Sequence, residues 1–492
     1  MVAPLHKEEE LQTSVEVSQE DLQWSTVSLL SDVLTRRNKK VRLEASVFGI
    51  EGRHAREVLK QNKWPRNQLV GDTGLATAYY PSRFSRVYQE DKTYPFITPK
   101  QIEDIKPEPK GYLSKLCEVD LKGLMPSSGE VLVTRSGSVG RCAYVNKTLE
   151  EYAVSDDVIR LHAYQKCDSG YIYAFLRTKI GQTLVTTNQY GAVIKHIEPE
   201  HLENIPIPVP PNELKKKIHD LIVHSYELRD ESNALLDEAE SLLYKALNLP
   251  PIDKLKPAYL TDSGLRSYPV KLSEFDSRLD GSYHVPIINE ILNVLQKEAA
   301  EVTNVGNPRI STKVILPNRF TRVYVEEGQG TVFFGHKQIF QVDPSDKKYL
   351  SVAYHRNKLE NELVLKENMV LISRSGTIGK VMLTPKHWER WVINEHVIRV
   401  VPADNEIAGY LSVFLNSDYG WTLVTRFTYG MNVDEIDDMQ VSRVPVPLLK
   451  DIEMQKHINN LALEANKMRT KAYYAEQKAI QITNEEVIYN AR

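Results

Sequence analysis

The sequence predicts an α+β protein: two similar globular domains separated by an antiparallel pair of long coiled-coil helices and related by a pseudo-twofold axis. Three observations predict this fold class. A repeat covers most of the chain, a heptad pattern follows each copy of the repeat, and short β-rich runs alternate with brief helical candidates inside each copy. Two copies are too few for a solenoid, so a twofold arrangement is the natural outcome.

The repeat is clearest where VLVTRSGSVG (131–140) matches VLISRSGTIG (370–379) at six of ten positions. The same offset of 239 residues aligns AVSDDVIR with VINEHVIR, LVTTNQYG with LVTRFTYG, and IPIPVP with VPVPLL. Upstream, at an offset of 236 residues, PSRFSRVY matches PNRFTRVY and RLEAS matches RLDGS. Matched blocks joined by segments of unequal length indicate two copies of one domain.

A heptad pattern follows each copy. In residues 212–247 leucine recurs every seven residues from Leu214 to Leu242, and small or apolar residues fill the alternate seam position. In the second copy, apolar residues spaced by four and three run from Met454 to Ile482. Such seams are typical of coiled coils, and small seam residues allow two backbones to approach closely. The alternative is that each helix lies against its own domain.

These features divide the chain into six segments. We expect an acidic leader at 1–35, a first domain at 36–211, a first spacer helix at 212–247, a linker at 248–271, a second domain at 272–450 and a second spacer helix at 451–490.

The composition is that of an ordinary globular protein, with 41% hydrophobic and 26% charged residues. A net charge of −3 excludes a uniformly basic nucleic-acid binder but leaves room for a local basic patch. No apolar run reaches the roughly 18 residues of a membrane span. The N-terminus is acidic, unlike a signal peptide, and three cysteines without paired or metal-type spacing fit a reducing compartment. We therefore expect a cytoplasmic protein.

The duplicated turn carries the first candidate binding residues. It does not have the spacing of a phosphate-binding P-loop, since Gly376 and Gly379 are three apart and Val381 follows Lys380. It offers hydroxyls, cations and backbone N–H groups that could hold a phosphate. The candidates are Arg135, Ser136, Ser138 and Arg141 in the first copy and Arg374, Ser375, Thr377 and Lys380 in the second. The alternative is a tight turn between two strands with no ligand.

Four further candidates lie in or beside other matched blocks. Tyr190 and Tyr429 precede glycines beside polar stretches that differ between the copies, and Lys195 lies in one of those stretches. Arg322 belongs to the FTRVY block. The tyrosines could instead pack at a helix C-cap, and Arg322 could be a strand residue that faces solvent.

With the turns TRSGSVGR and SRSGTIGK, the exits IPIPVPP and VPVPLL, and a helical segment closing each half, the chain resembles the specificity (S) subunit of type I restriction–modification systems. The resemblance extends from about Arg42 to about Ile488. One departure is that the first copy begins RLEASVFG and lacks the Gly-Thr-Pro opening common in such domains.

The resemblance implies two target-recognition domains, each reading one half of a split site in double-stranded DNA, with the helices fixing the gap. It also implies partners: DNA methyltransferase subunits, expected in two copies and holding S-adenosylmethionine, and a restriction–translocation subunit where the complex cleaves. This chain itself would hold no cofactor.

Catalytic motifs are missing from the sequence. An N6-adenine methyltransferase needs an Asp/Asn-Pro-Pro-aromatic tetrapeptide, and none occurs. The ELK at 213–215 lies on the heptad helix, and His196 and His201 lack the i, i+4 spacing of a zinc pair. We therefore expect no catalytic residue and no metal site. The rival function is a non-catalytic protein-interaction scaffold, which salt-dependent binding of duplex DNA would distinguish.

Overall fold

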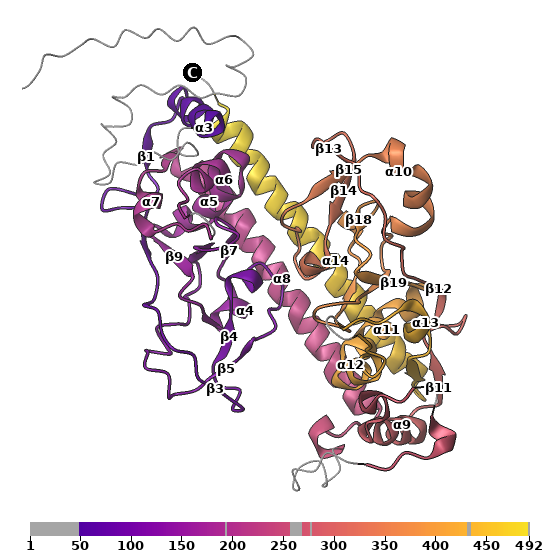
Figure 1. Cartoon of the computed structure of the whole chain (residues 1–492). Helices are drawn as coiled ribbons and strands as arrows, with labels where there is room; N and C mark the ends of the chain where they lie inside the picture. The colour runs from indigo at the N-terminus through magenta and orange to yellow at the C-terminus, as the bar shows by residue number, and fades with distance from the viewer. Residues whose placement is uncertain (1–48, 192–193, 256–267, 276–277, 431–433, 491–492) are drawn as a thin grey trace, which may run out of the picture.

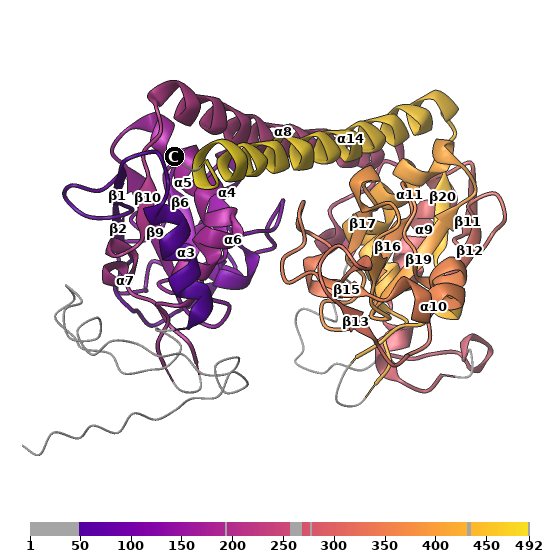
Figure 2. The same ribbon diagram turned by 90° about the horizontal axis from the view of Figure 1, so that it is seen from above.

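The computed structural model describes residues 49–191, 194–255, 268–275, 278–430 and 434–490. The expected acidic leader and the RLEAS block of the first copy lie outside these residues. Two domains of mixed helix and sheet are joined to a pair of long, crossing helices (Figure 1). Seen from above, the helix pair runs along one edge and both domains extend from the same side of it (Figure 2).

The two domains contain the same elements in nearly the same order. The first domain contains α3 (Ile50–Lys60), β1 (Arg66–Gln68), β2 (Ala76–Tyr79), β3 (Tyr88–Gln89), β4 (Pro95–Ile97), β5 (Gly111–Leu113), β6 (Val131–Thr134), β7 (Cys142–Tyr144), α4 (Lys147–Glu150), β8 (Ala153–Val154), β9 (Val158–Ala163), α5 (Lys166–Arg177), α6 (Lys179–Thr186), α7 (Pro199–Glu203) and β10 (Pro206–Pro208). The second contains α9 (Ile287–Glu298), β11 (Glu301–Asn304), β12 (Ser311–Ile315), β13 (Tyr324–Val325), β14 (Thr331–Phe334), β15 (Lys348–Leu350), α10 (Val352–Lys358), β16 (Val370–Ser373), β17 (Val381–Leu383), β18 (Val392–Ile393), β19 (Val397–Pro402), α11 (Asn405–Asn416), α12 (Asp418–Thr425), α13 (Asp438–Ser442) and β20 (Pro445–Leu448).

The sheet topology repeats strand for strand. In the first domain the strand orders are β2-β9-β6-β7 and β3-β5-β4-β8, and β1 pairs with β10. The second domain has the orders β12-β19-β16-β17 and β13-β15-β14-β18, with β11 paired to β20. In both domains all pairs are antiparallel except one, β4 with β8 and β14 with β18. The predicted α+β class and the internal duplication are confirmed.

Each long helix contributes to the cores of both domains. Helix α8 (Asn212–Ala246) places Ile218 and Ile222 in the core of the first domain, and its far end places Leu243 in the core of the second. Helix α14 (Ile452–Ile482) runs antiparallel to it and places Ile458 in the second core and Ile482 in the first. The alternative in which each helix lies only on its own domain is therefore wrong, because burial of both helix ends requires both domains.

Small side chains let the two helices approach closely. Ser225 and Ser232 of α8 and Ala465 and Ala472 of α14 are fully buried. The Ser225 hydroxyl donates to the carbonyl of Ala472 across the pair at 2.7 Å. The leucine line of the predicted seam is less buried, since Leu228 is buried but Leu214, Leu221, Leu235 and Leu242 are only partly covered. The close contact thus follows the small-residue line, as expected where backbones meet.

The middle of the helix pair holds a buried charged cluster that the heptad pattern does not predict. Glu476 forms an ion pair with Arg229 of the opposite helix and a second one with Arg177 of α5 at 3.3 Å. The Tyr173 hydroxyl donates to the same carboxylate at 2.7 Å. All four side chains lie at the junction of the first domain with both helices, so one carboxylate ties three elements together.

A glycine in each domain lets its core helix dock on a long helix. A methyl group at Gly409 would lie 2.3 Å from the carbonyl oxygen of Asn459, and one at Gly170 would lie 2.8 Å from the Cα of His219. We expect Gly409→Ala to lower the free energy of unfolding by about 1–3 kcal/mol, because overpacking forces α11 away from α14. Chemical denaturation checks this. Asn416→Ala, at an exposed position on the same helix, is the control, and equal effects of the two changes would contradict the prediction.

Two segments whose sequences differ between the copies, 96–112 and 332–350, meet at the contact between the domains. Asp104 forms an isolated antiparallel bridge with Gln341, and the N–H of Ile105 donates to the carbonyl of Phe340 at 2.8 Å. Ile105 also packs with Val342. Because Gln341, Phe340 and Val342 of the second domain form this contact, we expect exchange of the loop 335–349 to disturb it.

Candidate nucleic-acid interface

The duplicated turn joins two strands of each domain and is closed by its own hydrogen bonds. In the first copy the N–H of Gly140 donates to the carbonyl of Thr134 and the N–H of Arg141 to the Thr134 hydroxyl, both at 3.0 Å. Gly137 and Gly140 have φ of 74° and 87°, which other residues rarely adopt. The second copy repeats these bonds with Ser373 as acceptor. The glycines are therefore required for the turn, whatever it binds.

Arg135 is held by acidic side chains of its own domain. Its guanidinium pairs with Glu198 at 2.7 Å and with Asp157 at 3.3 Å, and it lies 4.6 Å from the centre of the Tyr80 ring. Burial by itself would raise the pKa of Glu198, but hydrogen bonds from Arg135, Tyr190 and Tyr80 outweigh burial and lower this pKa to about 2. In the free chain Arg135 thus anchors the turn to the segment before β9 and to the start of α7.

The low pKa of Glu198 makes this anchor sensitive to acid. Because the folded-state pKa lies below the usual 4.5, Glu198 stabilises the fold above about pH 4.5 and loses this effect as the pH falls towards 2. We expect Glu198→Gln to lower the free energy of unfolding by about 1.5–3 kcal/mol at pH 7. The difference from wild type should shrink below pH 4.5 in denaturation curves. The exposed neighbour Glu200, changed to Gln, is the control, and a constant difference down to pH 2.5 would contradict the assignment.

Arg374 has the equivalent arrangement in the second copy. It pairs with Glu435 at 2.6 Å and donates from Nε to the carbonyl of Ile436 at 3.0 Å. Its side chain is only 13% exposed. The hydroxyl of the next residue, Ser375, lies 2.8 Å from Nδ1 of His396. Both arginines therefore hold their turns in place before any ligand arrives.

The structure brings the tyrosine blocks next to the duplicated turns. Tyr190 pairs with His196, and His196 also bridges to Ser136. The N–H of Gly137 donates to the carbonyl of Lys195 at 3.1 Å, and the Tyr190 hydroxyl donates to Glu198 at 2.5 Å.

In the second domain Tyr429 pairs with Glu435, which also bridges to Ser375. Seven of the predicted residues thus lie in two equivalent groups: Arg135, Ser136, Tyr190 and Lys195 in the first domain, and Arg374, Ser375 and Tyr429 in the second.

The remaining predicted residues differ in accessibility. Ser138 and Thr377 are exposed at the tips of the turns. Arg141 and Lys380 lie at the domain contact instead, where Arg141 pairs with Asp346 of the second domain and Lys380 pairs with Glu108 of the first at 2.7 Å. Arg322 does not face solvent alone, since its guanidinium binds both carboxylate oxygens of Glu395. A direct contact of any of these residues with DNA stays a prediction.

Two arginines outside the predicted set are better placed for phosphate. Arg83 and Arg319 are equivalent residues of the PSRF and PNRF blocks, and both side chains are exposed. Neither has an ion pair or hydrogen bond to any residue that the structure describes. Their neighbours Arg86 and Arg322 are fixed by Asp156 and Glu395. The sequence did point to these residues, because each block repeats two arginines. The structure shows that only one arginine of each block is held by a carboxylate.

The described part of the chain lacks both a metal-binding cluster and a membrane-spanning helix. It contains no group of three or more histidine, cysteine or acidic side chains arranged to hold a metal ion. Its helices include none that is long and apolar enough to cross a lipid bilayer.

Comparison with solved structures finds distantly similar proteins. The S subunit of a type I restriction–modification system from M. genitalium is 11% identical, with a TM-score of 0.32 over 87% of this chain and 96% of that one. The HsdS subunit from Thermoanaerobacter tengcongensis is 13% identical, with a TM-score of 0.27 over 86% of this chain and 100% of that one. No curated protein matches the sequence.

The sequence matches a family model twice. The model describes the type I restriction modification DNA specificity domain, and its matches span residues 76–237 and 297–461. Each match takes in one duplicated turn, the paired tyrosine block and part of the long helix that follows. Since the two matches cover well over half of the sequence, the chain belongs to the type I restriction–modification DNA specificity family.

Proposed function

We propose that each domain of this DNA-recognition subunit reads one half of a split DNA site. The observation that carries the proposal is the repetition of strand order, turn and exposed arginine in two domains joined by an antiparallel helix pair. Duplex DNA has its own local twofold axes, so two equivalent surfaces related by a twofold axis fit half-sites on opposite strands. The polar stretches beside Tyr190 and Tyr429 differ in sequence, so the two half-sites should differ as well.

Within each domain the exposed groups divide by chemistry. Arg83 and Arg319 carry charge without a partner among the described residues and suit phosphate oxygens. Lys195, Ser138 and Thr377 are exposed beside the turns and can add further contacts. The anchored arginines, Arg135 and Arg374, keep the turns in a fixed geometry, which lowers the cost of ordering them on binding.

We also propose that this chain works without catalysis of its own and directs partner subunits. The proposal rests on the family and on the lack of a methyltransferase motif in the sequence. S-adenosylmethionine would bind to partner DNA methyltransferase subunits, two in number by the symmetry of the chain, with a restriction subunit joining where the complex cleaves. The helix pair is uncovered on the side away from the domains (Figure 2). This side offers the methyltransferase subunits a shared surface, on which Tyr474 of α14 is 57% exposed.

The test is DNA binding by the purified chain, with and without a methyltransferase subunit, over a range of salt concentrations. We expect binding that weakens steeply with salt, and methyl transfer only when the partner is present. A scaffold that binds proteins alone would give no salt-dependent shift of duplex DNA under either condition. Methyl transfer by the purified chain alone would overturn the non-catalytic role.

A further inference from the structure

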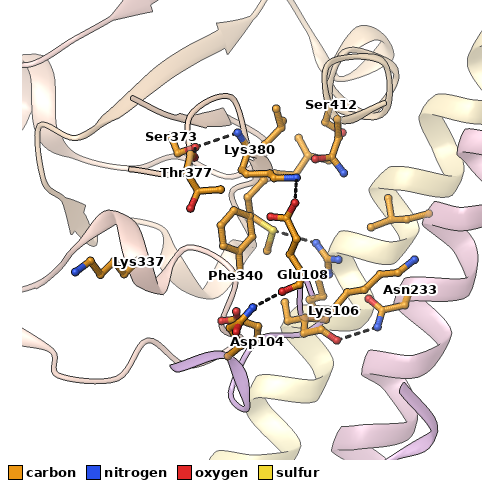
Figure 3. Close-up of a pocket in the computed structure, with 18 of the residues that line it drawn as sticks. Asp104, Lys106, Glu108, Asn233, Lys337, Phe340, Ser373, Thr377, Lys380 and Ser412 are labelled. Carbon is orange, nitrogen blue, oxygen red and sulfur yellow. Dashed lines mark hydrogen bonds and ion pairs between the residues drawn. The ribbon is translucent and has the colours of Figure 1, made fainter. Parts of the chain in front are cut away.

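A pocket of about 570 Å³ lies between the two domains beside the helix pair (Figure 3). Its lining comes from both halves of the chain, including Lys106 and Glu108 of the first domain, Lys380 of the second and Arg469 of α14. The ion pair of Lys380 with Glu108 joins the two domains across it (Figure 3). The sequence does not predict this pocket, and its origin lies in a difference between the two halves.

The pseudo-twofold relation pairs each residue near the pocket with one in the other half. The N–H of Gly170 donates to Nδ1 of His219 at 3.2 Å, and the N–H of Gly409 donates to Oδ1 of Asn459 at 2.8 Å. The two glycines are 239 residues apart and their two acceptors 240. The long helices therefore correspond at an offset of 240, which makes Arg469 the equivalent of Arg229.

In the first half the space beside Arg229 is filled. The side chains that fill it belong to the buried charged cluster, in which Glu476 binds Arg229, Arg177 and the Tyr173 hydroxyl, and Tyr226 packs 3.9 Å from the Arg229 guanidinium. In the second half smaller or uncharged residues occupy the equivalent positions. Leu236 replaces Glu476, and Asn416, Ser412 and Asn466 replace Arg177, Tyr173 and Tyr226. All four line the pocket, so the lost side-chain volume accounts for it.

This substitution leaves a buried cation without an anion. Arg469 is 8% exposed, and its guanidinium contacts the Ser232 hydroxyl at 3.3 Å and the Met382 sulfur at 3.1 Å. No carboxylate of the described residues forms an ion pair with it. Burial accordingly lowers the pKa of Arg469 to about 10. A buried unpaired charge is strongly unfavourable, and a bound counter-ion or a neighbouring acid would relieve the cost.

None of the acidic side chains that line the pocket serves as the anion for Arg469. Asp237 pairs with Lys106, and Glu108 pairs with Lys380. Burial raises the pKa of Asp104 well above its usual value, and burial also raises that of Glu240, so burial disfavours the charged form of both acids. Beside polar residues such as Asn233 and Asn466, the lining includes an apolar wall with Phe340, Val381 and Val413.

We propose that this pocket binds a small organic anion, a carboxylate or phosphate monoester that carries an apolar group, with Arg469 as its charge partner. The guanidinium supplies forked donors for two anion oxygens, and the apolar wall accepts the rest of the molecule. Because the lining comes from both domains and both long helices, the ligand bridges the two halves. A bound ligand would therefore hold the two domains at a more fixed distance from each other. Arg83 and Arg319, the proposed phosphate contacts, do not line this pocket, whereas Thr377 of the second turn does.

The experiment measures thermal unfolding of the full chain with phenyl phosphate, benzoate and inorganic phosphate at constant ionic strength, with benzyl alcohol as the uncharged control. We expect at least one of the two aromatic anions to raise Tm by about 3 °C or more at millimolar concentration, as follows from mass action, and benzyl alcohol to have no such effect. Phenyl phosphate and benzoate distinguish a phosphate ligand from a carboxylate ligand. Titration calorimetry should give one site per chain.

Three variants decide whether Arg469 is the partner. Arg469→Met should abolish the Tm shift. Leu236→Glu places a carboxylate where the first half has Glu476, and should abolish the shift while raising Tm without ligand. Lys471→Met, at an exposed position of the same helix, should leave the shift unchanged. The proposal is overturned if no anion shifts Tm, if Arg469→Met keeps the shift, or if inorganic phosphate acts as strongly as the aromatic anions in every variant, which would mean an adventitious ion only.

Discussion

Replacing Glu476 by Gln is expected to destabilise the protein strongly, by about 3–5 kcal/mol in the free energy of unfolding. The carboxylate is 1% exposed and is the ion-pair partner of the buried Arg229, so its loss leaves that guanidinium without an anion among the described residues, whereas Arg177 keeps Glu103 and Asp343. Denaturant unfolding followed by circular dichroism measures the change. We expect the transition to lose cooperativity as well, because the helix pair and the first domain share this cluster.

The same helix supplies the control for that experiment. Glu464 lies on α14 and pairs with Lys467 at 3.4 Å, but its side chain is 42% exposed. Exposed pairs contribute little, so Glu464→Gln should change the free energy of unfolding by about 0.5 kcal/mol or less. If both variants lost equal stability, the buried ion pairs of Glu476 would not be the cause of the loss, and the prediction would be contradicted.

The second large effect is expected on DNA binding, for the double change of Arg83 and Arg319 to Ala. Each arginine that contacts a phosphate releases about one counter-ion, so the slope of log K against log salt should fall by about 1.8 for the pair. The loss should be similar for all DNA sequences, since phosphate contacts carry no base information. Gel shifts at several salt concentrations measure it. Both residues are exposed, so the fold should be unchanged.

Arg374→Ala is the informative comparison for that result. Its side chain is 13% exposed, and its guanidinium binds Glu435 and a backbone carbonyl. We therefore expect a loss of stability in the second domain and an unchanged salt slope for the folded protein. If instead Arg374→Ala lowered the slope by about one and the change of Arg83 and Arg319 did not, the turns would bind phosphate directly and the exposed arginines would have another role.

Much of the architecture was predictable because it follows from short-range sequence patterns. The repeat at an offset of 239 residues predicts two equivalent domains, and the strand orders of the two domains are indeed the same. The heptad spacing predicts two long helices, found as α8 and α14, and the small seam residues predict their close approach. A hydrophobic period shows which face of a segment is buried, but it does not depend on what covers that face.

The location of the candidate contacts was only partly predictable. Sequence proximity placed Arg135 and Ser136 in one turn, and the fold added Tyr190 and Lys195 beside them. Which arginine of each pair is free could not be read from the blocks, because Arg83 and Arg86 look alike in sequence. The difference is set by Asp156, which lies 70 residues away and pairs with Arg86 alone.

The amino-acid sequence by itself thus determined the two domains, their twofold relation and the helices between them, since each depends on short-range pattern. The tertiary structure alone decided which charges are paired, that segments 96–112 and 332–350 meet at the domain contact, and that Arg469 lies in a pocket where Arg229 has Glu476. The physical reason is that the free energy of a charged side chain depends on burial and on partners distant in the sequence, and neither quantity is carried by the residue or its neighbours.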